Sequence, residues 1–212
     1  MSAVVRHPVF ARVYRRVAAA GEKHGLLELR VALLAGLSGT VVEVGAGDGA
    51  NFRHYPDAVT EVVAVEPEPY LRGHAEAAAS AAAVPVRVVD GSADDLPLPD
   101  GSVDAVVFCL VLCSVPDQRA ALAEARRVLR PGAELRFLEH VLAHRPGPMR
   151  RVQRSLDRFV WPQLFGGCHA GRDTVAAIDD AGFTITDLER SQFPEGTHTP
   201  VSPHVHGRAV RE

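Results

Sequence analysis

Three glycines alternate with other residues directly after a short apolar segment, at Gly45, Gly47 and Gly49. Glycine lets the backbone pass close to a ligand and adopt angles that a side chain would forbid. Two carboxylates accompany them, because Glu43 lies in the apolar segment and Asp48 lies inside the loop. A dinucleotide site presents bare amides to a diphosphate, which these carboxylates would repel. They suit a ligand without phosphate and with a positively charged amino acid end, and S-adenosylmethionine is such a ligand.

A second acidic marker, Glu66, follows the next apolar segment. A carboxylate there can accept hydrogen bonds from both ribose hydroxyls, although NAD sites use the same contact. Further on, Ser92 and Ala93 would lie against adenine, with Asp94 or Asp95 near its amino group or in an acidic surface loop. The predicted cofactor contacts are, in chain order, Glu43, Gly45, Ala46, Gly47, Gly49, Asn51, Glu66, Pro67, Ser92, Ala93, Asp94, Cys109 and Leu110.

Proton transfer from an acceptor would need a base near the strand ends that carry the cofactor. Glu139 and His140 end a later apolar segment and are the best placed candidates. Asp157 and His169 follow in a segment that should cover the acceptor, and they are further candidates. The pattern around His140 also fits a structural histidine, and both interpretations stay open.

The acceptor pocket is expected to be apolar, with Trp161 and Phe165 lining it. Cys113 and His204 are the other predicted acceptor contacts. We expect no covalent intermediate on Cys113 or Cys168, because direct displacement needs none. The histidines near the C-terminus lack the cysteine or carboxylate that would complete a recognisable ligand set, so we predict no metal.

The segments around these residues alternate between strand and helix patterns. Strands are predicted at 40–44, 60–67, 84–90, 103–115 and 133–141, with helices at 49–56, 69–83 and 116–129 between them. Such alternation predicts a parallel sheet covered on both faces by helices. Two helices are expected over 8–36, and a tail of helices at 145–165 and 171–181 precedes two antiparallel strands at 183–193 and 201–210.

Composition limits the class of protein. The chain has 212 residues, 47% apolar and 23% charged, which is typical of one soluble globular domain. Its formal net charge of −3 creates no field that would recruit nucleic acid or anionic lipid. The longest apolar run, 105–113, is shorter than the roughly 18 residues that a membrane span needs. No CxxC pair occurs, so we expect reduced thiols and a cytoplasmic protein.

Four segments resemble the successive motifs of class I S-adenosylmethionine-dependent methyltransferases: VVEVGAGDG, VVAVEP, GSADDLPLPDGSVDAV and RVLRPGAEL. The resemblance covers residues 38–140. It implies an α/β, Rossmann-like fold whose mostly parallel seven-stranded sheet has an antiparallel last strand and helices on both faces. We accordingly expect a single methyltransferase domain over 1–212, with a helical cap (1–36), a cofactor half (38–140) and an acceptor half (141–212).

A narrower likeness extends to about residue 210. The segments LVLCSV, FLEHV, LDRFVWPQLFGGC and SPHVHGRAV resemble the methyltransferase-like thiol S-methyltransferases and their bacterial relatives. It implies methyl transfer to a small-molecule thiol, with S-adenosylhomocysteine as the second product. A thiol with a pKa of about 8.5 is partly ionised at neutral pH, so weak assistance suffices. Three alternatives stay open: O-, N- or C-methylation of a natural-product or quinone-type molecule, an NAD(P)-dependent oxidoreductase, and a non-catalytic cofactor-binding module.

Overall fold

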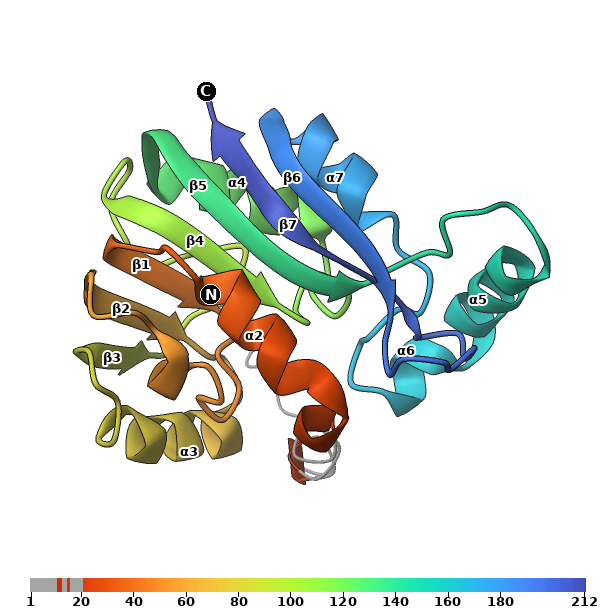
Figure 1. The fold of residues 1–212 in the computed structure, drawn as a ribbon, viewed down its shortest axis with the longest axis horizontal. Helices are drawn as coiled ribbons and strands as arrows, with labels where there is room; N and C mark the ends of the chain where they lie inside the picture. Colours follow the sequence, from red (N-terminus) through yellow and green to blue (C-terminus); the bar gives the residue numbers. More distant parts are fainter. Residues whose placement is uncertain (1–10, 13–14, 16–20) are drawn as a thin grey trace.

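The structure is a computed structural model, and it describes residues 11–12, 15 and 21–212. Its sheet has seven strands in the order β3-β2-β1-β4-β5-β7-β6 (Figure 1). The strands are β1 (Gly39–Val44), β2 (Val59–Val65), β3 (Val86–Val89), β4 (Val103–Cys109), β5 (Leu129–His140), β6 (Phe183–Gln192) and β7 (Pro203–Arg211). β1 to β5 pair in parallel, whereas β7 is antiparallel to both neighbours. The expected mostly parallel, seven-stranded sheet with an antiparallel last strand is confirmed.

The central strands are apolar on both faces because helices cover the sheet from both sides. Alternate residues of β1 enter different cores, with Val42 and Val44 in one buried cluster and Val41 in the other. The first cluster contains residues of α4 (Gln118–Val128) and α7 (Thr174–Asp180). The second contains residues of α2 (Leu27–Leu34) and α3 (Pro69–Ala79). Figure 1 shows α2 crossing in front of the sheet, with α4 behind it.

Side chains just before two of the helices define where they begin. Asp117 accepts hydrogen bonds from the amides of Arg119 and Ala120 at the start of α4, and Glu68 accepts one from Leu71 in α3. The remaining helical elements are η1 (Glu22–Leu26), η2 (Phe52–His54), α5 (Pro148–Phe159) and α6 (Trp161–Leu164). Over the part of the chain that the structure describes, no helix combines the length and the apolar character needed to cross a bilayer.

Two predicted elements are shorter in the structure. The helix expected at 49–56 is a single 3₁₀ turn, η2, because Tyr55 is extended before Pro56. The strand expected at 103–115 ends at Cys109, and the chain turns at Leu110, which has a φ of 61°. The residues after Leu110 therefore form a loop over the edge of the sheet rather than a continuation of the strand.

One strand is longer than expected, and the cap is described only in part. β5 begins at Leu129 rather than at 133, since Leu129 already pairs with Val103 of β4. α2 confirms the second helix of the cap, with Leu33 and Leu34 buried. Most of the first helix expected within 8–36 lies outside the described residues.

The carboxyl ends of the parallel strands meet at one edge of the sheet. Val44, the last residue of β1, is paired with Val65, the last residue of β2. The glycine loop and Glu66 therefore follow adjacent strand ends. β7 runs the opposite way, and its His204 is paired with His140 at the end of β5. Residues from both halves of the chain thus reach the same edge, which is where open α/β sheets bind their ligands.

Candidate active site

The glycine loop crosses the end of β1 and requires glycine at its positions. Gly45, Gly47 and Gly49 all have positive φ, at 68°, 60° and 81°. A Cβ atom on Gly45 would lie 2.7 Å from Val111, and one on Gly49 would lie 2.6 Å from Phe52. The amides of Gly45 and its neighbour both donate to the carbonyl oxygen of β2 residue 65. The backbone of the loop is therefore held close to the strand ends. The three glycines carry no side chain, and Gly45 and Gly49 have no room for one.

Glu66 lies directly beside this loop. Its Oε2 accepts a hydrogen bond from the amide of Gly47 at 2.8 Å, and its Oε1 accepts one from the amide of Glu68 at 2.9 Å. Burial raises the pKa of Glu66 to about 7, against the opposing effect of these two amides. The carboxyl group is thus fixed next to the loop and titrates near neutral pH.

Glu43 is buried beneath the loop, where it has its own hydrogen-bond partners. Its Oε1 accepts from Asn51 Nδ2 at 2.8 Å and its Oε2 from the Tyr55 hydroxyl at 2.7 Å. Arg30 of α2 donates to Asn51 Oδ1 at 2.8 Å and contacts Cys109 Sγ at 3.2 Å. Burial raises the pKa of Glu43, while these hydrogen bonds and the Arg30 charge oppose that shift. Glu43 therefore orients Asn51 rather than presenting both oxygens to a ligand.

Four other predicted cofactor residues follow the ends of β3 and β4. Ser92 and Ala93 are half-buried in a short turn closed by a bridge between Ser92 and Asp95, and Asp94 is exposed. Leu110 is the one residue besides glycine, in the part that the structure describes, with a positive φ. Such an angle costs energy for leucine, and strained backbone of this kind concentrates at functional sites.

Asp48, within the loop, forms an ion pair with Arg15 at 3.1 Å. Arg15 also contacts the Nε2 atom of His74 at 3.1 Å. The negative charge that the sequence placed in the loop is thus balanced by an arginine from the N-terminal segment. Pro67 follows Glu66 and is half-buried.

Glu139 is completely buried, and its carboxylate is occupied by a loop. Oε1 accepts hydrogen bonds from the amides of Val111 and Leu112 at 2.8 and 2.9 Å, and Oε2 accepts one from Cys113 at 3.3 Å. These contacts fix the loop that follows β4. The geometry therefore favours a positioning role for Glu139 over the role of general base that the sequence suggested.

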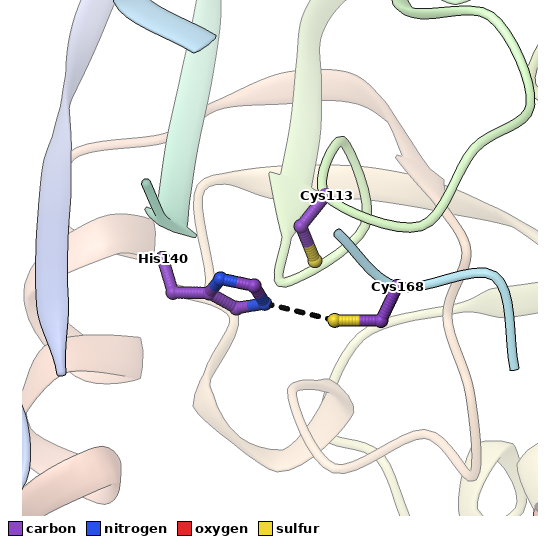
Figure 2. Close-up of side chains that lie close together, drawn as sticks. All are labelled: Cys113, His140 and Cys168. Carbon is purple, nitrogen blue, oxygen red and sulfur yellow. Dashed lines mark hydrogen bonds between the residues drawn. The ribbon is translucent and has the colours of Figure 1, made fainter. Parts of the chain in front are cut away.

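Next to Glu139, the side chain of His140 points toward two cysteines (Figure 2). His140 Nε2 lies 3.1 Å from Cys168 Sγ, and these two atoms and Cys113 Sγ all lie within 4.8 Å of one another. Burial lowers the pKa of His140, but Cys168 and nearby carboxylates together raise it above its usual value. The contact with Cys113 and burial raise the pKa of Cys168, so this thiol is protonated at neutral pH.

Asp157 and His169, the other two candidate bases, also hold the backbone. Asp157 Oδ1 accepts from the amide of Ala170 at 2.6 Å and Oδ2 accepts from Gly171 at 2.9 Å. The amide of His169 donates to the carbonyl oxygen of Cys113 at 2.8 Å. Burial lowers the pKa of the His169 ring, so the ring is neutral at pH 7. Asp157 thus shapes the loop that carries Cys168, and it has no oxygen left without an amide.

The predicted acceptor contacts divide into two groups. Trp161 and Phe165 stack at 4.1 Å between ring centroids on α6, and Phe165 is 40% exposed. His204 is buried, and its Nδ1 lies 2.9 Å from the carbonyl oxygen of Ser202. Burial lowers the pKa of His204 to about 4, so this ring is neutral. The rings of His140 and His204 are 6.1 Å apart, which brings His204 to the edge that carries the cysteines.

Comparison with known proteins identifies the family to which this chain belongs. The family model described as a methyltransferase domain matches residues 42–137. Thiol S-methyltransferase TMT1B of Homo sapiens is 38% identical over 183 residues, covering 84% of this chain and 74% of that protein. The chain belongs to the class I S-adenosylmethionine-dependent methyltransferases.

Two solved methyltransferase structures have the same fold. A methyltransferase of Thermotoga maritima superposes with a TM-score of 0.69 at 21% identity, covering 96% of this chain and 98% of that one. Geranyl diphosphate methyltransferase in complex with S-adenosylmethionine has a TM-score of 0.68 at 16% identity, covering 89% and 85%. At these identities the likeness concerns the architecture alone.

The residues of this methyltransferase fit the cofactor that its family uses. A loop with three positive φ angles lies between two strand ends, and a carboxyl group is fixed beside it. Backbone can therefore approach the ligand closely, and a hydrogen-bond acceptor for hydroxyl groups lies beside the loop, at the end of the neighbouring strand β2.

Sequence reasoning missed several residues that hold the site of the methyltransferase together. Arg30 has a usable signal, because it is a charged residue on the apolar face that carries Leu26, Leu33 and Leu34. Gln153 Nε2 donates to three carbonyl oxygens of the acceptor half, and Arg172 donates to those of residues 112 and 115. The residues around Gln153 and Arg172 in the sequence do not reveal these roles, because the carbonyl groups that they bind lie in loops distant along the chain.

Proposed function

We propose that this methyltransferase methylates the sulfur atom of a small-molecule thiol. The observation that carries the proposal is the extent of the likeness to thiol S-methyltransferase TMT1B, which covers 84% of the chain and therefore continues into the acceptor half. The matched methyltransferase domain itself stops at residue 137, before the residues of the acceptor side.

The chemistry of the acceptor side supports the same choice. The carboxylates of Glu139 and Asp157 are committed to backbone amides, and burial lowers the pKa of His204 to about 4, which makes its ring a weak base. A hydroxyl acceptor needs a free base to remove its proton, whereas a thiol ionises near neutral pH with weak assistance. A soft nucleophile that loses its proton readily is therefore the acceptor that suits these side chains.

The roles of the individual residues follow from their positions. S-adenosylmethionine supplies an electrophilic methyl group on a sulfonium centre. The glycine loop would pass closely beside the amino acid end, and Glu66 would accept the ribose hydroxyls. Ser92 and Ala93 would contact the adenine ring. Cys109 and the strained Leu110, at the end of β4, would pass beside the cofactor on the side of the glycine loop away from Glu66.

On the acceptor side, His140 would orient the thiol through Nε2, the nitrogen that now faces Cys168. Trp161 and Phe165 would contact the apolar part of the acceptor, since their stacked rings leave Phe165 partly exposed. Alignment of the acceptor with the methyl group can supply about 7–11 kcal/mol of the barrier in favourable cases. Positioning of the acceptor is therefore the main contribution that these residues would make to catalysis.

The test is incubation with labelled S-adenosylmethionine and a matched panel of alkyl thiols, phenols and amines. We expect label in methyl thioethers, and Glu66→Ala should abolish transfer because cofactor binding is lost. Glu76→Ala, which removes an exposed carboxylate from α3, serves as the matched control and should retain transfer. Transfer to phenols or amines alone would overturn the proposal.

A further inference from the structure

Three soft donor atoms converge at the carboxyl edge, on the acceptor side (Figure 2). They are the Sγ atoms of Cys113 and Cys168 and the Nε2 atom of His140, all within 4.8 Å of one another. In a tetrahedral zinc site, bond lengths of about 2.0–2.3 Å place two such donors roughly 3.5–3.8 Å apart. Small side-chain adjustments would therefore bring all three atoms to ligand distance of one ion.

The three residues come from separate segments, and hydrogen bonds tie these segments together. Glu139, which precedes His140, accepts from the amide of Cys113 at 3.3 Å. The carbonyl oxygen of Cys113 accepts from the amide of His169, which follows Cys168, at 2.8 Å. The backbone of Cys113 is thus fixed on one side by the neighbour of His140 and on the other by the neighbour of Cys168. A donor set held in this way resembles the supported ligands of metal centres.

We propose that Cys113, His140 and Cys168 bind one zinc ion and leave its fourth coordination position to the thiol acceptor. Zinc sites with three protein ligands and one exchangeable position are those that take part in reactions. The ligands are widely separated in the sequence and form no spaced motif, which is why the sequence predicted no metal. The zinc site stands on the geometry, whereas its role toward the acceptor rests on the proposed function.

The chemistry of this role is balanced without an oxidant or reductant. Cys113 and Cys168 bind zinc as thiolates and release their protons to solvent, and the acceptor thiol likewise loses its proton on binding and remains as a metal-bound thiolate. An electron pair on that sulfur forms the new sulfur–carbon bond to the methyl group. The bond between that carbon and the sulfonium sulfur breaks, and its electrons stay on the departing thioether. The methylated product is an uncharged thioether, a weaker ligand than thiolate, and leaves the metal.

The first test measures metal binding by the intact, reduced protein. After equilibrium dialysis against micromolar Zn²⁺, elemental analysis should find about one zinc per chain, the stoichiometry of a single three-ligand site. Cobalt substituted for zinc should show thiolate-to-metal charge-transfer absorption. Cys113→Ser, Cys168→Ser and His140→Ala should each weaken binding at least about tenfold, the effect of losing even a supporting partner in known sites.

The matched control is Cys109→Ala, which removes the remaining cysteine of the chain. Cys109 contacts Arg30 and lies outside the three-residue cluster, so this variant should bind the same amount of zinc. Circular dichroism of each variant reports whether it folds. Folded, reduced wild-type protein that retains no zinc would overturn the proposal. So would equal zinc retention by the Cys113→Ser/Cys168→Ser double variant, or a Cys113–Cys168 disulfide that persists under reducing conditions in place of metal.

A second experiment separates the metal site from the proposed function. An alkyl thiol added to the cobalt-substituted protein, without cofactor, should change the cobalt spectrum if the thiol enters the fourth position. An unchanged spectrum, or full thiol methylation by chelator-treated protein, would remove the acceptor role of zinc and leave thiol methylation intact. Zinc binding with no methylation of any thiol would contradict the proposed function and leave the metal site standing.

Discussion

The carboxyl group of Glu66 is expected to make cofactor binding depend on pH. Burial raises its pKa to about 7, and only the ionised form accepts hydrogen bonds from two ribose hydroxyls. Lowering the pH from 8 to 6 protonates most of this group. We therefore expect the affinity for S-adenosylhomocysteine, measured by calorimetry, to weaken about tenfold over this interval, the change in the ionised fraction.

The control for this prediction is Glu66→Gln, which keeps the shape of the side chain and removes its titration. It should bind the product weakly at both pH values, without the change attributed to Glu66. A wild-type affinity that is constant between pH 6 and 8 would contradict the assignment of Glu66 to the ribose.

At the scale of residues, the sequence identifies side-chain types better than it identifies their partners. The glycine loop can be recognised in the sequence because positive φ angles favour glycine at its positions. Glu139 and Asp157 look like bases in the sequence, yet each binds amides of a loop that lies far away along the chain. The cluster of Cys113, His140 and Cys168 is invisible for the same reason, since only tertiary structure brings its members together.

At the scale of elements, α2 does more than cover the sheet. It carries Arg30 into the buried network beneath the glycine loop, where the guanidinium binds Asn51 and Cys109. Arg30→Met should lower the free energy of unfolding by about 3 kcal/mol, because it leaves the buried Glu43 charge without its nearby cation. Urea denaturation measures this loss.

Arg53→Met is the matched control, because it removes an arginine of similar size that pairs with Glu22 at the surface. Its cost should stay within about 1 kcal/mol, as for other exposed ion pairs. Equal losses of unfolding free energy in the two variants would contradict the stabilising role given to the Arg30 charge in the buried network.

Element boundaries were predictable where one local rule decides them and were missed where tertiary pairing decides. The helix predicted from 69 begins at Pro69 after the capping residue Glu68, whereas the helix predicted from 116 begins two residues later, at Gln118, after the capping residue Asp117. β5 extends back to Leu129 because that residue pairs with β4, which no periodicity along the chain reveals. The short η2 turn gives the opposite error, since a helix pattern over 49–56 is stopped by the extended residue before Pro56.

At the scale of the whole molecule, the sheet depends on a close fit between β7 and β6. Gly207 of β7 is paired with Leu188 of β6, next to the irregularity in that strand, and a Cβ atom on it would lie 2.9 Å from Phe137 and closer still to the carbonyl oxygen of Asp187. Gly207→Ala should therefore lower the free energy of unfolding by about 2 kcal/mol through overpacking. Thermal or urea unfolding measures the change.

Gly73→Ala provides the contrast, because Gly73 lies in α3 with open space around its Cα. That substitution should raise stability by about 0.5–1 kcal/mol, since alanine favours the helix more than glycine does. If Gly207→Ala proves as well tolerated as Gly73→Ala, the strands do not approach each other as described.

The order of the strands was the part of the fold that local patterns could not supply. Alternating strands and helices predict a parallel sheet, and the last two strand-like runs predict an antiparallel pair. That β7 sits between β5 and β6 follows from no property of these segments alone, and the likeness to a family implied only that the last strand is antiparallel.

The position of β7 between β5 and β6 also determines the order in which the strands can pair during synthesis. β6 pairs with β7 alone among the strands of the described chain, so it has no partner until residues 203–211 leave the ribosome. Until then the outer edge of β5 stays unpaired, as a template for wrong pairing with another nascent chain. The parallel strands of the cofactor half can assemble earlier, because domains begin to fold from the N-terminal side. Arrival of β7 therefore completes the sheet and brings His204 to the acceptor side in a single late event, after the cofactor half already exists.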